Sequence, residues 1–151
     1  MNIVSLIGFI GFGVSLAVHV ATFGQTNVME HYPYVMVLHV VALANFALFI
    51  LLNKEFRTKK ADSNRAFKQA FQRMPILAKA VLIGCFVYAA VNFATGMITT
   101  NQMKRDKTAD PQAVSSMQME NQQLRIFSGH WMVFFLAPAM ICFFKGPRRI
   151  A

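Results

Sequence analysis

The sequence predicts an all-α integral membrane protein whose four transmembrane helices form an up-down-up-down bundle. Two observations lead to this class. Of the 151 residues, 56% are hydrophobic and only 14% are charged, whereas a soluble domain usually carries roughly 25% charged residues. The apolar residues are also gathered in long runs. We expect a single domain over residues 1–151, with helices at about 3–23, 33–52, 75–98 and 126–144.

Each apolar run has the length of a membrane span. Roughly 20 residues of α-helix cross about 30 Å of hydrocarbon, and lipid offers the backbone no other hydrogen-bond partner. The first run begins close to Met1. Because it lacks the basic start and the small-residue cleavage site of a secretory signal, we expect it to be a transmembrane helix.

The distribution of charge predicts the orientation of the helices. Basic residues gather between the second and third runs and after the fourth, and this side carries the whole net charge of +9. Positively charged loops tend to stay on the cytoplasmic side. Both ends of the chain are therefore expected to be cytoplasmic (N-in and C-in), with loops 24–32 and 99–125 outside. The predicted location is the cell inner (cytoplasmic) membrane, as a multi-pass protein.

The basic inner loop 54–73 has a predicted partner in the membrane itself. Its cations lie close to a bilayer whose cytoplasmic surface is anionic, so anionic headgroups of membrane lipids are the expected partner and nucleic acid is not. The stretch "DSNRAFKQAFQRMP" can begin a helix at Asp62 or Ser63 and places Phe67 and Phe71 on one face. We expect a short interfacial cytoplasmic helix there.

The second outer loop also contains a helical pattern. In "ADPQAVSSMQMENQQLRIF", Asp110 can act as N-cap and Pro111 can take the first helical position. Apolar residues then recur along one stripe. We expect an amphipathic outer helix from about residue 111 that leads into helix four, where it can cap the bundle or contact a partner.

Polar residues are predicted to form a layer near the outer ends of the helices. With the orientation above, His19, His39, Asn92 and His130 fall about 6 to 9 Å inside the outer boundary, at about 1.5 Å of rise per residue. An ionisable side chain at that depth indicates a function by default. Stripes of small and polar residues, typical of close helix contacts, are Gly8, Gly11, Ser15 and His19 on helix one, and Gly84, Tyr88, Asn92 and Thr95 or Gly96 on helix three.

A b-type haem is the most concrete hypothesis for this layer. Two neutral imidazoles at matched depth on neighbouring helices can ligate iron from opposite faces, and His19, His39 and His130 are the candidate ligands. Trp131 can cover the macrocycle, and Arg125 can contact a propionate. On this hypothesis the chain is a small electron-transfer subunit of the inner membrane.

Copper is the alternative metal, because thioether and imidazole groups suit Cu(I). Methionine is also an ordinary packing residue in apolar cores. The candidate copper ligands are the imidazoles of His19, His31, His39 and His130 and the thioethers of Met117 and Met119.

A cofactor-free role is equally compatible with the sequence. A structural, assembly or accessory subunit needs only the helices, and its partners would be other membrane subunits or further copies of the chain. A quinone or a lipid in the polar layer also stays open, since either needs only a few hydrogen-bonding groups and apolar walls. Motifs for hydrolytic or acid/base catalysis are missing from the sequence, so whether the chain is an enzyme is left open.

Overall fold

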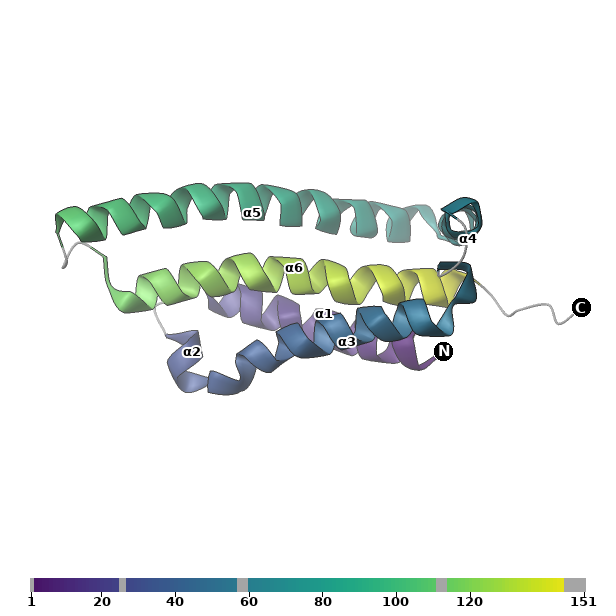
Figure 1. Cartoon of the computed structure of the whole chain (residues 1–151), viewed down its shortest axis with the longest axis horizontal. Helices are drawn as coiled ribbons and strands as arrows, with labels where there is room; N and C mark the ends of the chain where they lie inside the picture. Colours follow the sequence, from purple (N-terminus) through teal and green to yellow (C-terminus); the bar gives the residue numbers. More distant parts are fainter. Residues whose placement is uncertain (1, 25–26, 57–59, 111–113, 146–151) are drawn as a thin grey trace, which may run out of the picture.

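The computed structural model describes residues 2–24, 27–56, 60–110 and 114–145. All of its long elements are helices. Four of its helices are long and apolar enough to cross a membrane, by length and composition. They run along the length of the molecule (Figure 1). The long helices are α1 (Ile3–Ala21), α3 (Val37–Leu52, preceded by the 3-10 turn η1, Pro33–Met36), α5 (Ile76–Ala109) and α6 (Ser116–Phe144). The predicted all-helical class with four membrane-length helices is confirmed.

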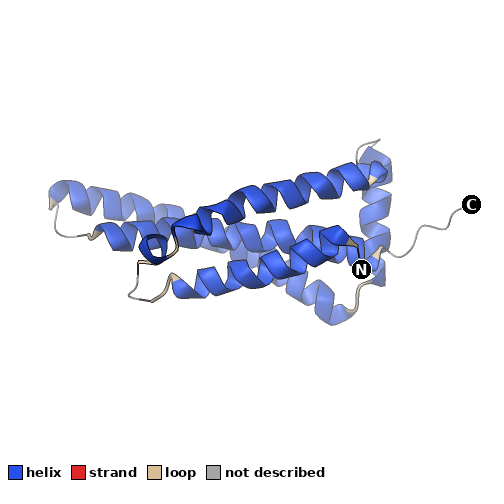
Figure 2. Cartoon of the chain, turned by 90° about the horizontal axis from the view of Figure 1, so that it is seen from below, coloured by secondary structure: helices blue, strands red, loops and turns tan. Residues whose placement is uncertain are grey.

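Short elements mark the two ends of the bundle. The short helix α2 (Val28–His31) lies between α1 and η1, and η2 (Lys54–Phe56) and α4 (Lys60–Arg73) lie between α3 and α5. Figure 2 shows α4 crossing the long helices at one end of the molecule. We call this the α4 end and the opposite one the α2 end. The helix predicted within residues 54–73 is therefore present.

Local sequence signals fix where the helices begin. Ser115 is the N-cap of α6, and its hydroxyl accepts from Gln118 N while the Gln118 side chain accepts from Ser115 N. This reciprocal pair satisfies backbone donors at the helix start. The prediction of Asp110 as this N-cap was wrong, because Asp110 instead ends α5. Pro111 lies outside the described residues.

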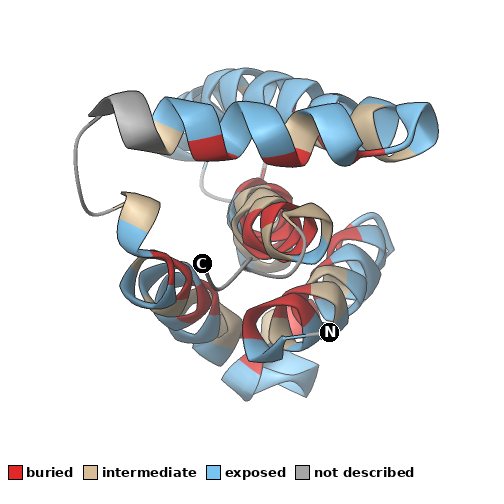
Figure 3. Ribbon diagram, turned by 90° about the vertical axis from the view of Figure 1, so that its right-hand side faces the viewer, coloured by how far each residue is buried: buried red, intermediate tan, exposed pale blue. Residues whose placement is uncertain are grey.

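Helix α6 is the centre of the bundle. Seen along the bundle in Figure 3, it lies between α5 on one side and α1 and α3 on the other. Three of its large side chains are almost completely buried: Leu124 and Phe135 are 0% exposed and Trp131 is 1% exposed. The structure packs Trp131 inside the protein.

Small residues allow α1 to approach α6 closely. A Cβ atom on Gly8 would lie 2.6 Å from the Phe135 carbonyl oxygen, and one on Gly11 would lie 2.4 Å from the Phe135 ring. Ser5 Oγ donates a hydrogen bond of 3.1 Å to the carbonyl oxygen of Ala139 across the same contact. The predicted stripe from Gly8 to His19 is thus the packing face of α1.

Helix α5 packs chiefly on α6 and leaves most of its surface uncovered. Its buried residues are Leu82, Ala89, Asn92, Gly96 and Thr100. Of the predicted stripe, Asn92 and Gly96 therefore do meet α6. Gly84 and Tyr88 are exposed instead, because they face the side of α5 that looks toward α1, where the helices stand apart.

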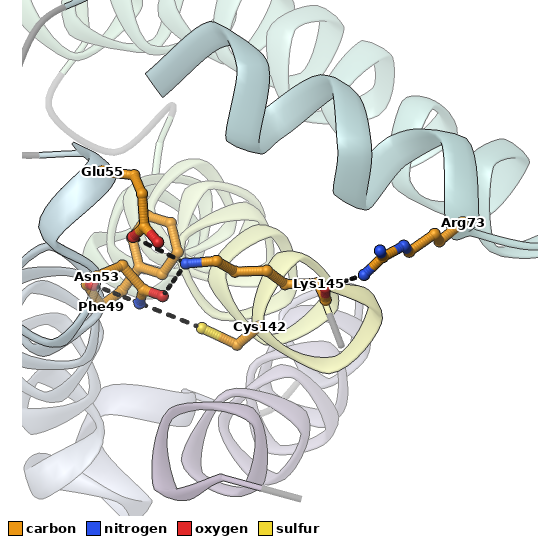
Figure 4. A network of polar contacts seen from close by, with 6 residues as sticks. All are labelled: Phe49, Asn53, Glu55, Arg73, Cys142 and Lys145. Atoms are coloured by element: carbon orange, nitrogen blue, oxygen red, sulfur yellow. Dashed lines mark hydrogen bonds and ion pairs between the residues drawn. The ribbon is translucent and has the colours of Figure 1, made fainter. Parts of the chain in front are cut away.

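Polar contacts hold the α4 end together (Figure 4). Lys145 Nζ lies 2.8 Å from Glu55 Oε2 and donates over 3.1 Å to Asn53 Oδ1. Asn53 Nδ2 donates to the Phe49 carbonyl oxygen at 2.7 Å, and Arg73 donates to the backbone carbonyl of Lys145. These contacts join the ends of α3, α4 and α6.

Candidate functional site

His19 lies at the meeting point of three helices, near the α2 end. It belongs to the last turn of α1 and is only 3% exposed. Its Nδ1 lies 2.8 Å from Ser128 Oγ on α6, and its Nε2 is hydrogen-bonded to the Tyr88 hydroxyl on α5. Both nitrogens of this imidazole are therefore engaged.

We infer the proton positions on these groups from the hydrogen-bond network, because the tautomer of His19 decides which ring nitrogen donates. Ser128 Oγ donates its single proton to the Arg125 carbonyl oxygen over 3.2 Å, so it accepts from His19 Nδ1–H. A neutral imidazole protonated at Nδ1 accepts at Nε2, and the Tyr88 hydroxyl donates there. The Tyr88 oxygen is left with lone pairs and no free proton.

Asn92 and Arg125 belong to the same network. Asn92 Nδ2 donates over 3.0 Å to the Arg125 carbonyl oxygen that also accepts from Ser128. Gly129 makes room for this amide, because a Cβ there would lie 2.5 Å from Asn92 Nδ2. The structure therefore brings together three of the residues predicted for the polar layer and its rim: His19, Asn92 and Arg125.

An apolar groove runs between α1 and α5, with the His19–Tyr88 pair toward its α2 end. It has a volume of about 520 Å³, is open along one side, and has walls that are almost wholly carbon. The Tyr88 side chain contributes to this open side and is 42% exposed. The lining residues of this α1–α5 groove are Phe12, Leu16, His19, Val20, Phe23, Val81, Gly84, Cys85, Tyr88 and Met132.

His39 has a different partner from His19. The Trp131 indole Nε1 donates to His39 Nδ1 over 3.0 Å, and the Phe127 ring meets the imidazole edge-on at 5.9 Å between centroids. Since Nδ1 accepts, a neutral His39 carries its proton on Nε2. It therefore presents an N–H group, not a free lone pair, to its surroundings.

His130 points to a third place. It directly precedes Trp131 on α6, and successive helical residues are rotated by about 100°. Its Nδ1 donates to the Ile126 carbonyl oxygen at 2.8 Å, and its ring meets Phe93 of α5 edge-on at 5.1 Å between centroids. His130 thus lies toward α5, whereas Trp131 and His39 pack on the α3 side.

These positions do not favour a haem held by two of the predicted histidines. Such a haem needs two unprotonated nitrogens that face each other across one space. His19 has both nitrogens engaged, His39 presents N–H, and only His130 keeps a free acceptor at Nε2. The b-haem hypothesis stays a prediction with little support from this arrangement.

Of the remaining metal candidates, Met117 lines a hollow together with Arg125. His31 is exposed, and its Nδ1 donates to the Asn27 carbonyl oxygen at 3.0 Å; Met117 and Met119 are half-buried. In the part of the chain that is described, no three residues of the types His, Cys, Asp and Glu gather as a metal-binding group. Methionine is not among these residue types, so the copper hypothesis stays a prediction.

The sequence did not identify Ser128 or Thr22 as residues of this network. It indicated Tyr88 only as a member of the small and polar stripe on the third helix. Tyr88 precedes Asn92 by one helical turn, a spacing that was visible, but nothing marked its hydroxyl as the partner of His19. The chain matches no protein-family model, no curated protein and no solved structure. Function is therefore argued from the site alone.

Proposed function

We propose that the chain is a small subunit of the cell inner membrane that binds a redox cofactor, an isoprenoid quinol, in the α1–α5 groove. The observation that carries this proposal is the apolar groove that leads to the hydrogen-bonded pair His19 and Tyr88. The proposal keeps the role expected from the sequence and replaces haem by an organic cofactor.

The shape and chemistry of the groove suit a long apolar molecule. Its open side lets a ligand enter directly from the bilayer, without passing through water. Gly84 lies in its wall, and a Cβ added there would meet no atom within 4 Å, so the groove has open space beside this residue. Carbon-lined walls with few polar groups at one end are typical of sites for lipid-soluble cofactors.

Tyr88 determines whether the polar group of the ligand must donate or accept a hydrogen bond. Because its proton is donated to His19 Nε2, its oxygen can only accept a further hydrogen bond. A ligand with an O–H group complements it, whereas a bare carbonyl does not. The reduced form of a quinone, which carries phenolic hydroxyls, fits this requirement better than the oxidised form.

The proposed orientation places the α2 end, and with it the His19–Tyr88 pair, in the outer leaflet. The support is the distribution of charge: exposed Arg65 and Lys68 lie on α4, at the end of the bundle that also holds Arg73 and Lys145. Phe67 and Phe71 stack at 5.9 Å between centroids on the same helix. We propose that α4 lies on the cytoplasmic surface and contacts anionic headgroups.

An accessory role is the second candidate, and the uncovered surface of α5 favours it. Large apolar side chains such as Ile83, Val87 and Val91 are 51%, 57% and 55% exposed. Lipid can cover them, but so can a helix of a neighbouring membrane subunit or of a second copy. This role does not require the groove to bind a cofactor.

Quinol binding is tested with a substitution, Gly84→Leu, that fills the groove without disturbing the helices. Purified chain in detergent is titrated with a short-chain quinol by calorimetry, and Gly84→Leu is compared with Gly13→Leu, since neither Cβ position meets an atom within 4 Å. We expect one saturable site in the unmodified chain and in Gly13→Leu, and none in Gly84→Leu. Tyr88→Phe should weaken binding about tenfold, the loss of one hydrogen bond.

Two results would count against the proposal. If Gly84→Leu binds the quinol as well as Gly13→Leu does, the groove is not the site. If an alkyl chain without a head group competes equally with the quinol, the groove holds lipid tails and the Tyr88 oxygen has no role in selection.

A further inference from the structure

A second hollow shares one lining residue, Phe23, with the α1–α5 groove. It has a volume of about 270 Å³ and mixed polar and apolar walls. Phe23 borders both spaces: its ring is 5.5 Å from the His19 ring, between centroids, and 3.9 Å from the Arg125 guanidinium carbon. We call this hollow the Arg125 cup; its wall includes Thr22, Phe23, Gln118, Asn121, Gln122 and Arg125.

The guanidinium of Arg125 is held in a fixed position. Nη2 donates to the Thr22 carbonyl oxygen at 2.7 Å, Nε donates to Thr22 Oγ1 at 3.3 Å, and Nη1 donates to Gln122 Oε1 at 3.4 Å. A guanidinium has five N–H donors. Two N–H donors therefore remain, one on each terminal nitrogen, and a guanidinium can bind an oxyanion through two donors at once.

No acidic side chain neutralises this cation in the described part of the chain. The ion pair found there joins Lys145 to Glu55 at the opposite end of the bundle. Glu120, five residues before Arg125, accepts instead from Asn27 Nδ2 at 2.9 Å. A partly buried, oriented guanidinium without a carboxylate is a site that an external anion can complete.

We propose that the Arg125 cup binds a phosphate group through the two remaining N–H donors of Arg125. Gln118 lines the cup, and its Oε1 already accepts from Ser115 N, so its amide nitrogen is a further donor. The site is independent of the groove, because its donors come from Arg125 and Gln118 and not from the His19–Tyr88 pair. The phosphate belongs either to a free anion or to a lipid headgroup.

The experiment measures both sources on the whole chain in detergent. Inorganic phosphate is titrated at constant ionic strength and followed by phosphorus NMR, and phosphatidylglycerol adducts are counted by native mass spectrometry against phosphatidylcholine. Arg125→Gln removes the donors, and Arg125→Lys keeps the charge but loses the fork. Arg105→Gln is the matched control, because Arg105 is an exposed cation at the same end of the molecule.

We expect saturable binding of phosphate or preferential binding of phosphatidylglycerol in the unmodified chain and in Arg105→Gln. Arg125→Lys should lower the affinity about tenfold and Arg125→Gln more strongly, since a charged bidentate pair is lost. Binding of inorganic phosphate identifies a free anion, and binding of the lipid alone identifies a headgroup.

The proposal is overturned if the unmodified chain binds neither probe, a result that does not depend on how any variant folds. It is also overturned if Arg105→Gln and Arg125→Gln reduce binding equally, because the effect is then one of net charge. Quinol binding in the groove can fail or succeed without changing either result.

Discussion

Trp131 and His39 form a polar pair between α3 and α6, in which the indole is buried and the imidazole half-buried. The indole is 1% exposed and its N–H reaches His39 Nδ1 at 3.0 Å. A buried donor that loses its partner costs about 1–3 kcal/mol, whereas removal of both partners is nearly neutral. The pair therefore stabilises the fold because each residue supplies the hydrogen-bond partner of the other. A role of His39 as a haem ligand would interrupt this hydrogen bond.

A double-mutant cycle tests this pair. We expect His39→Leu to lower the free energy of unfolding by about 1–2 kcal/mol, because it leaves the indole N–H unsatisfied. Trp131→Phe should cost less in the His39→Leu background than in the unmodified chain. Thermal unfolding in detergent gives the four values. Strictly additive effects of the two substitutions would show that the hydrogen bond does not couple them.

At this scale the sequence predicted part of the polar layer. Counting residues along each helix placed His19, His39, Asn92 and His130 at one level, and two of them, His19 and Asn92, join the network around the Arg125 carbonyl oxygen. Direction around a helix axis depends on which neighbour each face meets. Nothing in the residue pattern near His130 showed that its ring turns to Phe93.

At the scale of helices, the contact of α1 with α6 is set by glycine. Gly8 faces the Phe135 carbonyl oxygen and the Ala139 side chain, both of which a Cβ would approach to 2.6 Å. Backbone atoms cannot move aside as the end of a flexible side chain can. The small-residue stripe was recognisable in the sequence because close helix contacts in membranes require it.

Gly8→Ala is therefore expected to destabilise the bundle, and Gly13→Ala is its matched control. A Cβ on Gly13 meets nothing within 4 Å, so this change should be neutral or slightly stabilising through better helix propensity. Gly8→Ala should cost about 1–3 kcal/mol as α1 is pushed from α6. Thermal melting of both variants in one detergent measures the difference. Equal melting temperatures would contradict the close packing described here.

The extent of α5 shows where the sequence prediction stopped short. The apolar run ends near residue 98, but the helix continues to Ala109 and reaches 34 residues. Hydrophobicity marks where lipid ends and not where a helix ends. The polar residues after Ile98 include good helix formers, and the helix stops at Asp110 just before Pro111.

At the scale of the whole molecule, the separation of charge between the two ends predicts the orientation in the membrane. Lys68 is exposed on α4, and Arg105 is exposed near the end of α5 at the α2 end. If the basic α4 end is cytoplasmic, these two positions lie on opposite sides of the membrane.

Cysteine labelling tests the orientation. The native thiols Cys85 and Cys142 are free and are first replaced by serine. In intact cells, a membrane-impermeant maleimide should label Arg105→Cys and leave Lys68→Cys unlabelled until the membrane is opened. The opposite pattern would invert the proposed topology and place the His19–Tyr88 pair in the inner leaflet.

The whole fold was more accessible from the sequence than the site. Membrane-length helices follow from local composition, because lipid forces each apolar run to satisfy its own backbone. The groove depends on how far α5 stands from α1, a distance set by contacts of both helices with α6. Nothing in the sequence around Gly84 or Tyr88 indicates that these two residues line the α1–α5 groove.

Photo-crosslinking in membranes with an azido-quinol, a photoreactive probe kept in the reduced form, tests the central claim most directly. The proposal predicts that label is found on peptides from α1 and α5 that line the groove, around Leu16 and Gly84. It also predicts that excess quinol prevents the labelling and that Gly84→Leu abolishes it. Label spread over the exposed faces of α3 and α5, or labelling that quinol does not reduce, would contradict a quinol site between α1 and α5.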